Sequence, residues 1–152
     1  MNFFAKAPDV TKIEADLLAV FASSAEAKKV DMAMGGMLTE VAATEDFEAK
    51  QGATLLIHTH GKIPAKRVLL VGLGKTEEAT VANFQMIAAT IGRKAKGVAA
   101  KRIAIALPKD IDAQPVVEGV RLGTYSFIKY KSEEERKKEK IIEEVLLLVS
   151  PG

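Results

Sequence analysis

One run of residues, Arg67-Val-Leu-Leu-Val-Gly-Leu-Gly74, limits most strongly what this chain can fold into. After its first residue the run is continuously apolar and does not alternate between apolar and polar side chains. A strand with one face in water alternates, whereas a strand covered on both faces does not. The run therefore predicts an inner strand of a sheet that has helices on both faces.

Other segments supply the remaining strands of such a sheet. The segment 54–60 is joined to 67–73 by a short loop containing Gly and Pro, so we expect these two strands to pair antiparallel. Further strands are predicted at 3–7, 16–22, 101–107 and 145–149. With the intervening helices, this order predicts one α/β domain over residues 1–152, with three α/β/α layers and a mixed, mostly central sheet.

Capping and proline signals place two of the helices. Thr80 is the expected N-cap of one helix, and Gly97 is its expected C′ residue. Asp112 or Gln114 opens another helix, with Pro115 in its first turn, that runs through Phe127. The stretch 129–144 that follows carries six basic and six acidic residues, which predicts a solvated connector or the end of a surface helix.

A third helix is predicted around a pair of glycines. Apolar residues recur at helical spacing and predict a face packed into the core: Val30, Met34, Met37, Leu38 and Val41. Gly35 and Gly36 lie inside this pattern, although a glycine in a helix costs about 1 kcal/mol relative to alanine. Two explanations remain open, either a neighbour packed close to the backbone or a break in the helix.

Composition narrows the classes of function. The chain has no cysteine, which excludes disulfides, thiolate zinc sites and cysteine nucleophiles and fits a reducing compartment. The 22 Lys+Arg and 20 Asp+Glu leave a net charge of +2, so no overall field attracts a polyanion. No apolar run approaches the ~20 residues of a membrane span. We expect a cytoplasmic protein that contacts no membrane.

The glycines after the apolar run are candidate ligand-binding residues, because a glycine-rich turn between strand and helix can present backbone N–H groups to a phosphate. The candidates are Gly72, Gly74 and Lys75. Their spacing matches neither known phosphate loop, since a Walker loop requires glycine at position 69 and a dinucleotide fingerprint requires glycine or alanine at 77. A tight exit from a central strand is the simpler interpretation.

The two histidines, His58 and His60, stand at i and i+2 of a predicted strand and therefore share a face. A zinc centre requires three or four ligands, so without a third donor the pair predicts exposed or sheet-covering side chains and no metal site. A basic group surrounds the predicted end of the helix at 97: Arg93, Lys94, Lys96, Lys101 and Arg102. Cations there complement the helix dipole, and no aromatic side chain interleaves them, which argues against nucleic-acid binding.

Three segments together resemble the N-terminal domain of the leucyl (cytosol) aminopeptidase family. They are Gly35-Gly-Met-Leu38, Arg67-Val-Leu-Leu-Val-Gly-Leu-Gly-Lys75 and Glu118-Gly-Val-Arg-Leu-Gly-Thr-Tyr-Ser-Phe-Ile-Lys-Tyr-Lys131. The resemblance covers nearly the whole chain and implies a macro-domain-like fold. It also implies a parent enzyme that is cytoplasmic, commonly hexameric, and uses two divalent metals, zinc or manganese, to remove N-terminal amino acids from peptides.

The same resemblance assigns no catalytic or metal-binding residue to this chain. The family's signature, Asn-Thr-Asp-Ala-Glu-Gly-Arg, belongs to a C-terminal catalytic domain and is absent here, and the chain ends at Gly152 where the family continues. We therefore expect a fragment with no cofactor of its own. Its implied partners are the catalytic domain and neighbouring subunits. Peptide substrate is expected to bind only in the full-length parent enzyme.

Two alternatives stay open. A free-standing macro-like module would bind a nucleotide or ADP-ribose-type ligand at Gly72–Thr76. A DNA-binding accessory domain, as in some bacterial members of the family, would use Arg93, Lys94 and Lys96, although the nearly neutral net charge does not favour nucleic acid.

Overall fold

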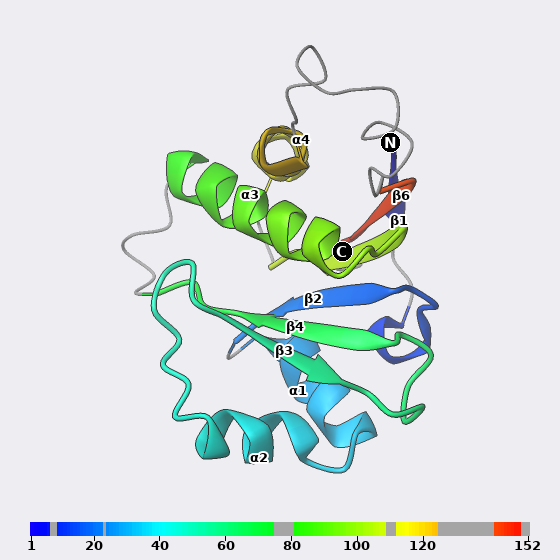
Figure 1. The fold of residues 1–152 in the computed structure, drawn as a ribbon, viewed down its shortest axis with the longest axis vertical. Coiled ribbons are helices and arrows are strands. Elements are labelled where there is room, and N and C mark those ends of the chain that lie inside the picture. Colours follow the sequence, from blue (N-terminus) through cyan, green and yellow to red (C-terminus); the bar gives the residue numbers. More distant parts are fainter. Residues whose placement is uncertain (7–8, 23, 75–80, 109–111, 125–141, 150–152) are drawn as a thin grey trace.

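The computed structural model describes residues 1–6, 9–22, 24–74, 81–108, 112–124 and 142–149. Six strands form one sheet. Helices cover both faces of this sheet (Figure 1). The elements in chain order are β1 (Asn2–Lys6), a 3-10 turn η1 (Val10–Lys12), β2 (Leu17–Phe21), α1 (Ala25–Ala33), α2 (Met37–Thr44), β3 (Thr54–His58), β4 (Arg67–Val71), α3 (Val81–Gly97), β5 (Arg102–Ala106), α4 (Ala113–Thr124) and β6 (Glu144–Leu148). The predicted α/β/α class is confirmed.

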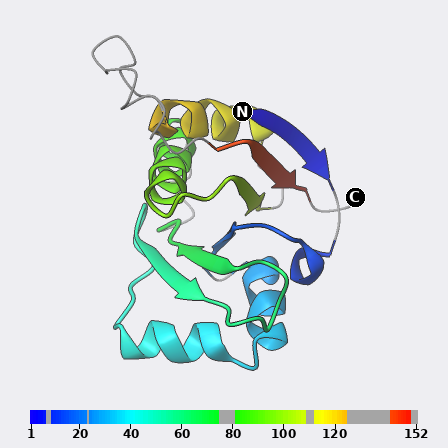
Figure 2. The ribbon, with the colours of Figure 1, turned by 45° about the vertical axis from the view of Figure 1, so that its right-hand side comes forward.

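The strand order is β1-β6-β5-β2-β4-β3, and every neighbouring pair is parallel except β3 with β4. Leu56 of β3 lies opposite Leu69 of β4 in that antiparallel pair, so the predicted hairpin is confirmed. Figure 2 shows β1 beside β6, which joins the start of the chain to its last described strand.

The apolar strands are buried on both faces. In β4, Leu69 and Val71 belong to the core under α3 and α4, whereas Val68 and Leu70 belong to the core under α1 and α2. The residues of β2 are likewise shared between the two cores. Since side chains alternate across a strand, a continuously apolar run is what an inner strand with two covered faces requires.

The paired glycines break the helix. Gly35 and Gly36 have φ of +69° and +84°, a left-handed backbone that separates α1 from α2. A Cβ at either glycine would meet no atom within 4 Å, so the alternative of close packing is wrong. The predicted apolar face survives the break, because Val30, Met34 and Leu38 are all buried in the same core.

Glycines also set the spacing of α3 and α4. A Cβ on Gly119 would lie 2.3 Å from the carbonyl oxygen of Gln85, and one on Gly123 would lie 2.1 Å from that of Ala89. Both contacts are with backbone, which cannot swing aside as a side chain can. The two helices therefore approach closely enough that only glycine fits at these positions.

The helix ends differ in part from expectation. Gly97 is the last residue of α3, and the left-handed residue beyond it is Ala99, with φ of +58°. The prediction of Gly97 as the C′ residue is thus wrong, because the N–H of Ala100 reaches back to the carbonyl of Ala95. Asp112 does open α4, since its Oδ1 accepts the N–H of Gln114 at 3.2 Å. Thr80, Phe127 and residues 129–141 lie outside the described residues.

No helix in the described ranges combines the length and the apolar character that a membrane crossing demands.

Candidate functional site

The glycine turn after β4 is held by the chain that precedes β3. Gly72 donates its N–H to the carbonyl of Ala53 at 2.8 Å and accepts the N–H of Gly52 at 3.0 Å. Gly74, with φ of +71°, donates its N–H to the carbonyl of Ala49 at 3.1 Å. A Cβ on Gly72 would lie 2.2 Å from the carbonyl oxygen of Lys50, so the close approach of segment 49–53 accounts for this glycine.

These hydrogen bonds bear on the expected phosphate cradle. A phosphate loop leaves backbone N–H groups free to point at the ligand. At Gly72 and Gly74 both N–H groups already have carbonyl partners, which a ligand would have to replace. Lys75 lies outside the described residues. The ligand-binding role of these three residues therefore stays a prediction.

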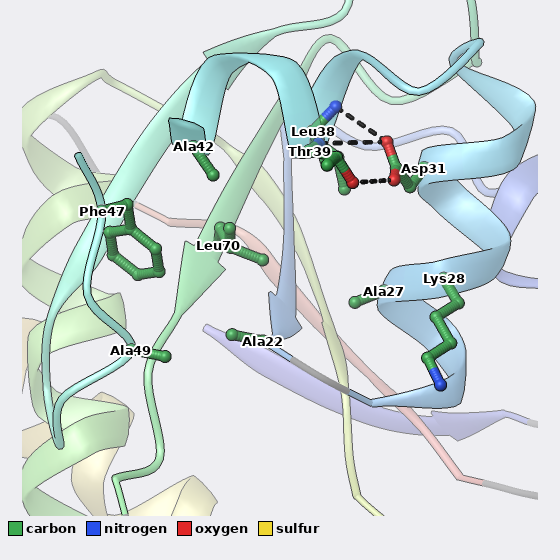
Figure 3. A pocket seen from close by; sticks show the side chains of 10 residues that line it. All are labelled: Ala22, Ala27, Lys28, Asp31, Leu38, Thr39, Ala42, Phe47, Ala49 and Leu70. Carbon is green, nitrogen blue, oxygen red and sulfur yellow. Dashed lines mark hydrogen bonds between the residues drawn. The ribbon is translucent and has the colours of Figure 1, made fainter. Parts of the chain in front are cut away.

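A pocket of about 300 Å³ opens between α1, α2 and the sheet. Figure 3 shows apolar side chains around most of it, including Ala27, Leu38, Ala42, Phe47 and Leu70. The sequence pattern did not indicate this pocket. Its lining comes from α1, α2, the segment after α2, and the end of β2 and β4.

The carboxylate of Asp31, which lines this pocket, is hydrogen-bonded to the start of α2. Asp31 Oδ1 accepts the N–H of Leu38 at 2.9 Å and that of Thr39 at 3.3 Å, and Oδ2 accepts the hydroxyl of Thr39 (Figure 3). These are the otherwise unpaired donors of the first turn of α2, whose own N-cap is Gly36 and provides no side-chain acceptor. Asp31 thus serves as a remote cap for α2.

The histidine pair is exposed, the first of the two predicted arrangements. The ring centroids of His58 and His60 are 6.2 Å apart with their planes inclined at 44°, and both side chains are in contact with solvent. Across the residues that the structure describes, no three His, Asp or Glu side chains are grouped so that they could hold a metal ion. The described residues therefore do not fit a three- or four-ligand zinc centre or a two-metal centre.

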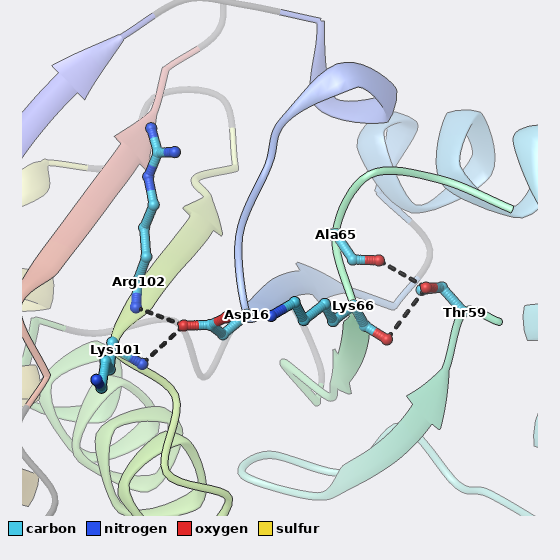
Figure 4. Close-up of polar contacts among 6 residues, drawn as sticks. All are labelled: Asp16, Thr59, Ala65, Lys66, Lys101 and Arg102. Carbon is cyan, nitrogen blue, oxygen red and sulfur yellow. Dashed lines mark hydrogen bonds and ion pairs between the residues drawn. The ribbon is translucent and has the colours of Figure 1, made fainter. Parts of the chain in front are cut away.

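A second polar cluster, which no local sequence pattern indicates, lies at the amino ends of β2 and β5 (Figure 4). Asp16 Oδ2 accepts the N–H groups of Lys101 at 2.9 Å and Arg102 at 3.0 Å, and Oδ1 lies 3.4 Å from Lys66 Nζ. Burial raises the pKa of Asp16, but the backbone donors of Arg102 and Lys101 and the Lys66 cation outweigh it, so that pKa lies below its ordinary value. The cluster ties the start of β5 and Lys66 to Asp16.

Several members of the predicted basic group have partners within the fold. Arg93 donates to Thr90 Oγ1 at 3.2 Å, Lys96 Nζ donates to the carbonyl of Thr124 at 3.3 Å, and Arg102 Nε lies 3.1 Å from Glu144 Oε2. Two of these contacts tie α3 or β5 to a neighbouring element. Three of the five cations thus have partners within the fold.

Comparison with known proteins places this architecture in a class. The fold is macrodomain-like: a macro domain of ganglioside induced differentiation associated protein 2 superposes with a TM-score of 0.71 over 98% of this chain and 77% of its own, at 14% identity. A mutant of tomato leucine aminopeptidase superposes with a TM-score of 0.79 over 99% of this chain and 33% of its own, at 22% identity. At such identities the likeness establishes the fold.

Sequence comparison then gives the family. The model of the cytosol aminopeptidase family N-terminal domain matches residues 18–134. A probable cytosol aminopeptidase of Geobacter sp. (strain M21) is 37% identical over 130 residues, covering 82% of this chain and 26% of that protein. Another probable cytosol aminopeptidase, from Alkaliphilus metalliredigens, is 34% identical over 126 residues, covering 78% of this chain and 25% of that protein. The chain belongs to the cytosol aminopeptidase family, whose N-terminal domain it matches, and it spans about a quarter of the length of these relatives.

Proposed function

We propose that this chain is the non-catalytic N-terminal domain of a cytoplasmic, metal-dependent aminopeptidase. The observation that carries the proposal is the family match over residues 18–134, together with relatives of which this chain covers only about a quarter. The word cytosol in the names of those relatives supports the cytoplasmic location. The parent would remove N-terminal amino acids from peptides with two divalent ions, zinc or manganese; a neighbour of similar fold, a bottromycin maturation enzyme, was solved in complex with Mn.

The chemistry of the described residues supports assigning hydrolysis to the remainder of the parent. A two-metal hydrolase needs a cluster of carboxylates and other ligands that hold both ions and orient a water. Among the described residues, the carboxylates of Asp31 and Asp16 accept backbone N–H groups of the fold. No step of the reaction is therefore assigned to this domain.

The role that remains is structural. We assign three roles to the domain. It packs against the catalytic domain, contributes contacts between subunits of a homo-oligomer, and shapes the access of peptide substrate. The helical layer formed by α3 and α4 carries two large apolar side chains that face solvent. They are Met86 on α3 and Leu122 on α4, which are 67% and 69% exposed. Exposed apolar side chains of this size are candidates for such a contact.

The first experiment is to read the source gene past the codon for Gly152. A frame that continues into Asn-Thr-Asp-Ala-Glu-Gly-Arg supports the proposal, and a stop codon there contradicts it. In parallel, the isolated chain is assayed with a leucine anilide and added Mn²⁺. We expect no hydrolysis, and a rate that stays with the chain through further purification would contradict the non-catalytic role.

The alternative functions predict other results. A free-standing macro-like module would respond to ADP-ribose, whereas a DNA-binding domain would show salt-sensitive affinity for duplex DNA. Charge reversal at Arg93, Lys94 and Lys96 would weaken that affinity.

A further inference from the structure

The two histidines lie next to each other on the surface at the end of β3. His58 is the last residue of the strand, and His60 follows two residues later. Between them Thr59 is only 1% exposed, whereas both histidine side chains are exposed to solvent. Their ring centroids are 6.2 Å apart.

Hydrogen bonds fix the backbone that carries the pair. Thr59 Oγ1 lies 2.6 Å from the carbonyl oxygen of Ala65 and 3.1 Å from that of Lys66, and the N–H of Thr59 donates to Lys66 at 3.2 Å (Figure 4). His60 itself has φ of +52°, which a non-glycine residue adopts only at a cost. The backbone that carries both histidines is therefore anchored to the rest of the fold, so the two side chains start from fixed positions.

This separation suits one ion between two imidazoles. With a metal–nitrogen bond of about 2.0–2.1 Å, each ring centroid would lie ~3 Å from the ion, so two centroids ~6 Å apart can share it when their nitrogens bind on opposite sides of the ion. Neutral imidazole binds zinc, copper and nickel, and the Irving–Williams order places Cu²⁺ highest among divalent ions. We propose that His58 and His60 form a two-histidine site for a divalent transition metal ion, with Cu²⁺ bound most tightly and water filling the other positions.

The charges around the pair give this site an unusual salt dependence. Arg67 lies opposite His58 in the β3–β4 register, and the loop contributes Lys62 and Lys66. The residues lining the adjoining pocket of about 290 Å³ include no carboxylate. Because cations repel a dication and salt screens that repulsion, binding should strengthen as ionic strength rises, the reverse of binding by acidic side chains.

The test is a Cu²⁺ titration of the 152-residue chain, prepared without a histidine tag and followed by electron paramagnetic resonance. We expect one ion per chain with splitting from two imidazole nitrogens, and affinity that rises with NaCl. His58→Thr keeps a strand-forming residue, and His60→Asn tolerates the left-handed backbone, so both variants should give the circular dichroism spectrum of the wild type. Each should lower the affinity for Cu²⁺ by roughly tenfold or more.

Lys62→Ala is the matched control, since it changes the same loop and keeps both histidines. It should bind Cu²⁺ as tightly as the wild type or more tightly. Three results would overturn the proposal: no bound Cu²⁺ with nitrogen splitting, equal affinity in the wild type and both histidine variants, or a loss in Lys62→Ala as large as in those variants. The test is independent of aminopeptidase activity, so its failure leaves the proposed function standing.

Discussion

Asp16 Oδ2 accepts the backbone N–H of Arg102 at 3.0 Å, although 86 positions separate the two residues. The same oxygen accepts the N–H of Lys101, and the backbone N–H of Asp16 donates to the carbonyl of Arg102 at 2.8 Å. These bonds stand at the amino ends of β2 and β5, two neighbouring parallel strands. Asp16 therefore sets where the central strands begin to pair.

Replacing Asp16 should lower stability in a pH-dependent way. Asp16→Ala leaves two backbone donors without their acceptor and should cost about 1–3 kcal/mol of unfolding free energy at pH 7. Asp16→Asn keeps an acceptor oxygen and should cost less. Both are measured by urea denaturation.

The sign of the pH effect follows from the lowered pKa of Asp16. A carboxylate whose pKa is lower in the folded state stabilises the fold above the unfolded pKa, and this stabilisation is lost as pH falls through the folded value. The wild type should therefore lose unfolding free energy below about pH 4, where Asp carboxyls titrate in the unfolded chain. The difference between wild type and Asp16→Asn should shrink over that range. A difference that stayed constant down to pH 2 would contradict the assignment.

Alanine at Gly119 should destabilise the domain despite its better helix propensity. The added Cβ would lie 2.3 Å from the carbonyl oxygen of Gln85, so α3 and α4 must move apart. Such overpacking costs about 1–3 kcal/mol. Gly97→Ala is the matched control, because this helical glycine has open space around its Cβ position and should be neutral or slightly stabilising. Thermal unfolding compares the two, and equal melting temperatures would show that the helices are not in close contact.

The layered fold could be predicted because a strand that is buried on both faces has a continuously apolar sequence. Leu69 and Leu70 point into different cores, so the sequence of β4 cannot alternate. The antiparallel pairing of β3 with β4 could also be predicted, because the short loop that joins the two strands is visible in the local sequence. The break at Gly35 and Gly36 could be named as one of two explanations, but only the structure decides between them.

Contacts between distant segments could not be predicted in this way. Nothing near Asp16 in the sequence indicates Arg102 as its partner, and nothing near Gly72 indicates that segment 49–53 takes up its N–H and carbonyl groups. A single chain gives the types of the side chains but not the pairing of segments far apart. The candidate site at Gly72 and Gly74 rests on a local feature, glycines between a strand and a helix, whereas the pairing of their N–H groups is a tertiary property.

Removing the carboxylate of Asp31 should loosen α2. Its Oδ1 accepts the N–H groups of Leu38 and Thr39 at the start of a helix that has glycine as its N-cap. Loss of a helix cap costs about 0.5–2 kcal/mol, so Asp31→Ala should lower the unfolding free energy by that amount, and Asp31→Asn should retain most of it. Hydrogen exchange locates the effect, because the amides of Leu38 and Thr39 should exchange faster in Asp31→Ala. Unchanged exchange at both amides would show that the cap is dispensable.

The hydrogen bonds at the glycine turn predict that nucleotide phosphates do not bind there. Gly72 and Gly74 donate their N–H groups to the carbonyls of Ala53 and Ala49, and a ligand would have to replace both partners without a net gain of hydrogen bonds. Millimolar ADP-ribose should therefore leave the melting temperature and the amide resonances of Gly72 and Gly74 unchanged. Gly72→Ala should instead shift the amides of segment 49–53 and destabilise the chain by about 1–3 kcal/mol, because its Cβ would meet the carbonyl oxygen of Lys50. Saturable shifts at Gly72 and Gly74 on adding ADP-ribose would show that the turn opens for a ligand and would favour the macro-like binding module over a purely structural domain.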